Sequence, residues 1–136
     1  MTAGINRLDR LVGVHPKLAE AIKAIIDELG DQGLTILITQ GLRTTEQQAG
    51  LYAQGRSREG KIVTNVDGHT KKSMHQQQLD GFGHAVDVCW RVNGTVTWDG
   101  PWPTLGELAR GHGLVWGGDW THFVDRPHLE LPMEKT

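Results

Sequence analysis

The sequence predicts an α+β domain, and three observations lead to that prediction. A helical pattern near the N-terminus is followed by mostly hairpin-linked strand patterns, an order typical of α+β folds. Glycine supplies 18 of the 136 residues, nearly twice the usual share, which favours many turns over a helical bundle. A chain of this length fits one compact domain, 1–136, that buries roughly two-thirds of its unfolded surface.

The first predicted element is a helix over residues 16–29. Its apolar side chains recur at the helical period, Pro16 suits the first turn, and Gly30 stands where a helix would end. The run LTILIT at 34–39 is short, rich in β-branched residues and bounded by glycines. This run predicts a buried strand.

A second helix is predicted over residues 46–54, and a long loop follows it. Thr44 can cap this helix with Gln47 in the capping-box position, and Gly55 ends it. Residues 56–82 are polar and weakly periodic, which indicates a functional loop.

The second half of the chain is predicted to be mostly strand. Asn93-Gly94 is a strong hairpin-turn signal between two strand-like runs. The predicted elements are strands at 85–90, 95–98, 114–116 and 127–131, and a short helix at 103–110 that ends at Gly111 or Gly113.

Composition excludes several classes of protein. Fourteen basic against sixteen acidic residues give a net charge of −2, so bulk charge does not argue for nucleic-acid binding. The single Cys89 excludes an internal disulfide and a cysteine-rich zinc site. No apolar run approaches the roughly 20 residues of a membrane span, and no signal-peptide pattern is present. We therefore expect cytoplasmic synthesis without stable membrane insertion.

Two ionisable residues stand inside apolar strand patterns. Asp87 lies within AVDVC, and His128 lies between Pro127 and Leu129. Burying such groups is costly unless they are paired or bind a metal. Both are candidate metal ligands, and a structural Asp–His hydrogen bond explains the same facts equally well.

A third ligand would have to share their face of the sheet. His84 lies three residues before Asp87 and would point to the opposite face of a regular strand. His75, arriving from the loop, is better placed, with a solvated loop histidine as its alternative. Three His or carboxylate ligands plus an open position are typical of catalytic zinc. Other templates fail, because the chain contains neither H-E-x-x-H nor G-x-S-x-G.

Several motifs occur in an order typical of one family. They are SMH at 73–75, GHAVD at 83–87 and DRPH at 125–128, preceded by QGLRT at 40–44 and the segment EQQAGLYAQGR. With these motifs the chain resembles the M15 family of zinc peptidases, and most of all its small phage L-alanyl-D-glutamate endopeptidases. The resemblance extends over about 16–131.

The resemblance implies a zinc ion (Zn2+) bound by His75, Asp87 and His128, with water in the fourth position. Asp125 would be the general base that takes a proton from that water and delivers it to the leaving amine. Arg43 would stabilise the developing oxyanion or hold a substrate carboxylate.

Two further residues are expected near the zinc site. The resemblance implies that Ser73 hydrogen-bonds the substrate or the loop near the metal. The alternative, that Ser73 only forms part of a turn, explains its position almost as well. Glu130 shares a strand face with His128 and could orient its imidazole. A solvated edge residue is the alternative for Glu130.

The spacing before Asp87 departs from the family pattern. His75 lies twelve residues before Asp87, whereas the pattern S-x-H-x-x-G-x-A-x-D has seven. The simplest account is a five-residue insertion within QQQLDGF, with His75 kept as ligand. The alternative makes Asp80 or His84 the ligand.

The expected function is therefore hydrolysis of a peptidoglycan stem-peptide bond, L-Ala-D-Glu, by a monomeric phage endolysin. Such an enzyme acts on the cell wall after a partner such as a holin opens the membrane. The alternatives are a D-Ala-D-Ala carboxypeptidase or dipeptidase, and a non-catalytic wall-binding module that retains structural zinc.

Overall fold

The computed structural model describes residues 2–133, and its centre is a five-stranded antiparallel sheet. The strands run in the order β1-β2-β5-β4, and β3 pairs with the C-terminal half of β2. Their bounds are β1 Thr35–Gln40, β2 Ala85–Val92, β3 Thr95–Thr97, β4 Val115–Trp116 and β5 His128–Glu130. The predicted α+β class is confirmed.

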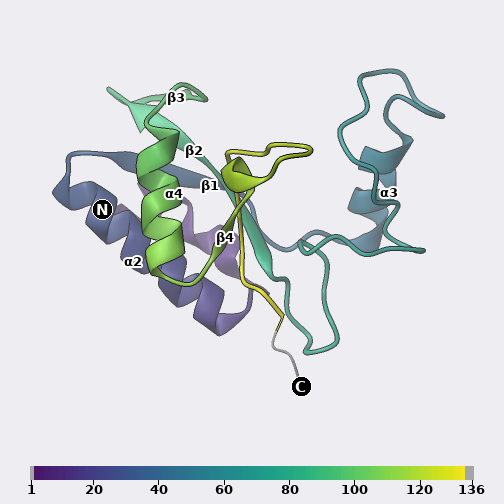
Figure 1. The fold of residues 1–136 in the computed structure, drawn as a ribbon, viewed down its shortest axis with the longest axis horizontal. Helices are drawn as coiled ribbons and strands as arrows, with labels where there is room; N and C mark the ends of the chain where they lie inside the picture. The colour runs from purple at the N-terminus through teal and green to yellow at the C-terminus, as the bar shows by residue number, and fades with distance from the viewer. Residues whose placement is uncertain (1, 134–136) are drawn as a thin grey trace.

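Two of the longer helices lie against this sheet, and a third does not. Figure 1 shows α2 and α4 side by side against the sheet, while α3 stands apart with the loop that follows it. Within residues 2–133, no helix combines the length and apolar character needed to cross a membrane. The helices are α1 Thr2–Asn6, α2 Pro16–Asp31, α3 Thr45–Ala53 and α4 Trp102–Gly111, with short 3-10 turns η1 Leu8–Leu11 and η2 Gly117–Asp119.

The hydrophobic core lies between the helices α2 and α4 and one face of the sheet. Alternate residues of β2, namely Val86, Val88 and Trp90, belong to this core. Because side chains alternate along a strand, Asp87 is directed to the other face. That second face of the sheet is therefore the one that carries polar groups. The helices contribute Leu18, Ile22, Ile25, Leu29, Leu105 and Ala109, all fully buried.

Local signals located most elements correctly. The predicted helix 16–29 continues to Asp31, and Thr44 and Gln47 form the predicted capping box of α3. Asn93 and Gly94 have φ angles of 51° and 78°, as a tight hairpin turn requires. The sequence did not predict α1 and η1, because elements of four or five residues are too short to show a periodic pattern.

Candidate metal centre and active site

The register of two neighbouring strands brings Asp87 and His128 together. β2 and β5 are antiparallel, with Asp87 opposite His128, and His128 Nδ1 lies 3.1 Å from Asp87 Oδ1. The other ring nitrogen, Nε2, lies 2.7 Å from Glu130 Oε1. Burial alone would lower the pKa of His128, but the hydrogen bonds to Asp87 and Glu130 raise that pKa to about 9.

His75 reaches the same place from the loop before β2. Its side chain is buried, and its Nε2 lies 3.3 Å from Asp87 Oδ1. Its Nδ1 lies 2.9 Å from the carbonyl oxygen of Gly41, just after β1. Burial would raise the pKa of Asp87, yet the hydrogen bonds from His128 and His75 outweigh it and hold that pKa below its usual range.

These three side chains fit a zinc ion. With bonds of about 2.0–2.1 Å, neighbouring ligand atoms of a tetrahedral zinc lie about 3.3 Å apart. The two distances to Asp87 Oδ1, 3.3 and 3.1 Å, match that spacing. Each histidine also has its second nitrogen beside a carbonyl or carboxylate oxygen, the arrangement that orients metal-binding histidines.

Asp125 stands at the edge of this group. Its Oδ2 lies 4.0 Å from His128 Nδ1, and 46% of its side chain is exposed. The peptide N–H of Asp125 donates to the carbonyl oxygen of Gly117 at 2.9 Å, which fixes the loop before β5. Burial and the nearby charge of Asp87 raise the pKa of Asp125. A carboxylate with a raised pKa beside a candidate metal centre is suited to accepting a proton.

Arg43 lies beside Asp87. Its Nη2 lies 3.9 Å from Asp87 Oδ2, and its peptide N–H donates to the His75 carbonyl oxygen at 2.7 Å. Burial lowers the pKa of the Arg43 guanidinium, although Asp87 and Asp125 act against this shift. Its Nε is buried and has no hydrogen-bond partner among the described residues. Arg43 also lines the cleft, where its guanidinium can meet a substrate oxygen.

Gln48 is a site residue that the sequence analysis missed. Its Oε1 accepts a 2.8 Å hydrogen bond from Arg43 Nη1, and its Nε2 donates to the Val66 carbonyl oxygen at 2.7 Å. Gln48 is fully buried in α3. It had no sequence signal, because a polar residue in a helix without an apolar stripe looks like an exposed one.

Ser73 and Glu130 also lie at this site. Ser73 Oγ accepts a hydrogen bond from the His75 peptide N–H at 3.2 Å. Glu130 contacts His128, and 17% of the Glu130 side chain is exposed. Both residues line the same cleft as the three candidate ligands.

The cleft has a volume of about 720 Å³. Lys71, Lys72 and Ser73 line it from the loop after α3, and Phe123 and Val124 line it from the loop before β5. Trp120 adds an aromatic surface, because its ring centroid lies 5.0 Å from that of His128. The cleft thus combines candidate ligands, a proton acceptor and a buried cation.

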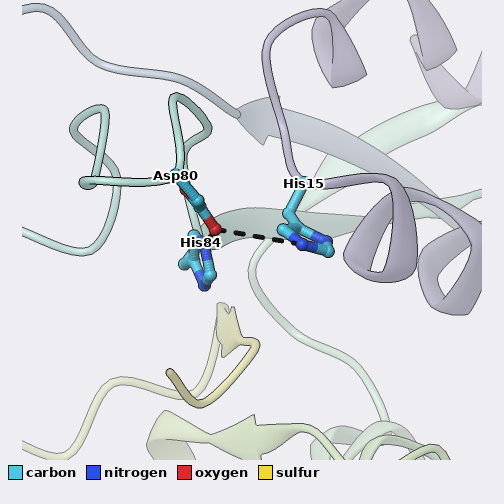
Figure 2. A group of neighbouring side chains, drawn as sticks. All are labelled: His15, Asp80 and His84. Carbon is cyan, nitrogen blue, oxygen red and sulfur yellow. Dashed lines mark hydrogen bonds and ion pairs between the residues drawn. The ribbon is translucent and has the colours of Figure 1, made fainter. Parts of the chain in front are cut away.

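Asp80 and His84, the alternative ligands, lie in a separate group. Together with His15 they form a second cluster, whereas His75, Asp87 and His128 form the first. Figure 2 shows the second cluster between the loop that carries Asp80 and the start of α2.

Fold and site together define a class of protein. Residues 67–131 match the family model of M15 peptidases described as D-alanyl-D-alanine carboxypeptidase. The chain is 33% identical over 129 residues to the peptidoglycan L-alanyl-D-glutamate endopeptidase CwlK of Bacillus subtilis. This match spans 87% of this chain and 73% of CwlK. The chain therefore belongs to the M15 peptidase family, as its motifs predicted.

Other relatives agree with this assignment. The L-alanyl-D-glutamate peptidase of Listeria phage A118 is 33% identical over 123 residues, which span 85% of this chain and 38% of the phage protein. The crystal structure of the Serratia marcescens L-Ala D-Glu endopeptidase ChiX has a TM-score of 0.65 and 27% identity, over 97% of this chain and 89% of ChiX. The vancomycin resistance D,D-dipeptidase VanXYg shares the fold, with a TM-score of 0.60 and 17% identity over 87% of this chain and 50% of VanXYg.

Proposed function

We propose that this M15 peptidase is a zinc-dependent peptidoglycan endopeptidase that hydrolyses the L-Ala-D-Glu bond of the stem peptide. The observation that carries the proposal is the grouping of His75, Asp87 and His128 with Asp125 and Arg43 on one cleft. The names of CwlK, ChiX and the phage A118 enzyme support the choice of bond.

The proposed zinc site consists of three ligands and the groups that orient them. When bound, zinc would supply Lewis-acid polarisation of the scissile carbonyl and ease ionisation of water. His75, Asp87 and His128 would hold it, while the Gly41 carbonyl and Glu130 orient the two imidazoles. The hydrogen bond from the His75 peptide N–H to Ser73 fixes the turn that carries this histidine.

Asp125 transfers the proton in this proposal, and Arg43 stabilises negative charge. The Asp125 carboxylate takes a proton from the attacking water as the new carbon–oxygen bond forms. The same group then delivers that proton to the leaving amine as the peptide carbon–nitrogen bond breaks. Arg43, held by Gln48, offers its guanidinium to the negative charge on the carbonyl oxygen or to a substrate carboxylate.

The structure weighs against a purely structural zinc site. Such a site needs no proton acceptor, yet Asp125 lies 4.0 Å from His128 on the same cleft. A closed four-ligand site would need a further ligand such as Asp80 or His84. Those residues belong to the separate cluster with His15.

Mass spectrometry of digested peptidoglycan tests the proposal. We expect new L-Ala carboxyl ends and D-Glu amino ends, abolished by a chelator and restored by Zn2+. Release of D-Ala instead would identify a carboxypeptidase or dipeptidase. Binding to peptidoglycan without any new ends would identify a wall-binding module.

We also propose a lytic role as a monomeric endolysin of phage type, made in the cytoplasm. The phage A118 relative supports this role. Induced expression with and without a co-expressed holin tests it, because lysis should depend on the holin. Gel filtration with light scattering tests the monomer. Lysis without holin, or a dimer, would contradict the corresponding part.

A further inference from the structure

The second cluster contains three side chains with metal-binding chemistry. His15 precedes α2, while Asp80 and His84 come from the loop before β2 (Figure 2). Their candidate ligand atoms all lie within 4.8 Å of one another. The mechanism proposed above uses none of them.

His84 has an oxygen acceptor beside each of its ring nitrogens. His84 Nδ1 lies 3.2 Å from the Leu131 carbonyl oxygen, and Nε2 lies 2.6 Å from Asp80 Oδ2. Both oxygens are acceptors, and a neutral imidazole has only one N–H. With Nδ1–H donated to Leu131, the lone pair of Nε2 faces a carboxylate. A metal ion held between Nε2 and the Asp80 carboxylate would take up that lone pair.

The geometry of Asp80 favours a shared ion. Its Oδ1 accepts from the Phe82 peptide N–H at 3.0 Å, which leaves Oδ2 for the imidazoles. His15 Nε2 lies 3.9 Å from that Oδ2, and the centroids of the His15 and His84 rings are 5.1 Å apart. A neighbouring cavity of about 380 Å³, lined by all three residues, has room for water ligands.

We propose that His15, Asp80 and His84 form a second metal site of this protein, one that takes a zinc-class divalent ion. Two imidazoles and a carboxylate are ligands that zinc accepts. The Leu131 carbonyl would orient His84, as the Gly41 carbonyl orients His75. A bound ion would tie the start of α2 to the loop between His75 and β2.

This second site binds more weakly than the first. His15 Nδ1 accepts the Lys17 peptide N–H at 3.0 Å, so coordination through Nε2 moves a proton to Nδ1 and breaks this helix cap. The start of α2 has positive potential, and Lys17 lines the same cavity. The 2.6 Å contact must also widen to admit an ion. Asp80 can move for this purpose, because 36% of its side chain is exposed. We expect an affinity at least tenfold below that of the first site.

Equilibrium dialysis against buffered free Zn2+, with metal analysis, tests the proposal. The wild type should bind one equivalent at low zinc and a second at a concentration at least tenfold higher. Asp80→Asn and His15→Asn should each lose the second equivalent and keep the first. His15→Asn separates metal binding from helix capping, because asparagine retains an N-cap acceptor and removes the imidazole. His112→Asn is the control, since His112 pairs with Glu28 outside the cluster.

Ring NMR signals of the wild type give a second measurement that needs no variant. The His15 and His84 resonances should shift with the second equivalent and not with the first. Saturation at one equivalent would overturn the proposal. Retention of the second equivalent in Asp80→Asn or His15→Asn would overturn it as well. Neither result bears on peptidoglycan cleavage.

Discussion

Asp87 shows how one residue can organise a site. It lies on the sheet face opposite the core, where Oδ1 faces His75 and His128 and Oδ2 faces Arg43 at 3.9 Å. Burial disfavours its charged form, and the two histidines more than offset that effect. A charge in an otherwise apolar strand is therefore held by contacts on three sides.

Asp125→Asn tests the role of the proton acceptor. The amide keeps the size of the side chain but cannot take a proton, so kcat should fall by on the order of 10²–10⁴. Zinc content should be unchanged, since Asp125 is outside the proposed ligand set of His75, Asp87 and His128. Cleavage assays and metal analysis measure both quantities. Asp119→Asn is the control, because Asp119 pairs with Arg110 on the surface. Wild-type turnover in Asp125→Asn would remove this residue from the mechanism.

His75→Ala tests the choice of ligand. At limiting zinc, loss of this imidazole should strip most metal from the first site, because only Asp87 and His128 remain. Asp80→Ala should keep the first equivalent. Metal analysis after dialysis makes the comparison. The reverse pattern would show that the insertion is placed wrongly and that Asp80 is the ligand.

At the scale of elements, α3 connects a local capping signal to the site. Thr44 and Gln47 form a reciprocal capping box, and the next residue, Gln48, accepts a hydrogen bond from Arg43. Thr44→Ala should lower the free energy of unfolding by about 1 kcal/mol, because an N-terminal N–H loses its acceptor. Thr44→Ser keeps the hydroxyl and should be near neutral. Denaturant unfolding of the zinc-saturated protein measures both, and equal losses would contradict the capping role.

The loop after α3 has its own anchor in Asp67. Its Oδ1 accepts from the peptide N–H groups of His69, Thr70 and Lys71 at 2.9, 2.8 and 3.2 Å. These hydrogen bonds lower the pKa of Asp67 to about 2 from 3.8.

A lowered folded-state pKa means that the carboxylate stabilises the fold above the unfolded-state pKa. This stabilisation decreases as pH falls from about 4 toward 2, the window between the two pKa values. The difference in melting temperature between wild type and Asp67→Asn should shrink over that window. Thermal scans at several pH values measure it. A difference independent of pH would refute the charge effect.

At the scale of the molecule, the core and the site lie on opposite faces of the same sheet. Val86 and Val88 of β2 belong to the same core cluster as the buried residues of α2, while Asp87, between them, lines the cleft. Stability of the core and alignment of the candidate ligands therefore depend on the same strand.

Ile22→Ala should cost about 2–5 kcal/mol of unfolding free energy, the range for truncating a buried aliphatic side chain. Ile22 is fully buried in α2, whereas Val12 is 80% exposed. Val12→Ala should stay within about 0.5 kcal/mol. Denaturant titration at saturating zinc compares the two. Similar small losses would show that α2 is not part of the cooperative core.

The sequence by itself determined what depends on neighbours along the chain. The apolar period of 16–29, the Thr44 capping box and the Asn93-Gly94 turn each act within a few residues, and all three are present. The motifs around His75, Asp87 and His128 likewise predicted the M15 family, which the relatives confirm.

Only the tertiary structure decided how distant groups meet. The pairing of Asp87 with His128 depends on strand register across 41 residues, and the contact of His75 with Gly41 spans 34. The second cluster joins His15 to Asp80 and His84, and buried Gln48 acts through Arg43. Such contacts leave no local pattern, because packing of the whole chain selects them and a residue's neighbours in sequence do not.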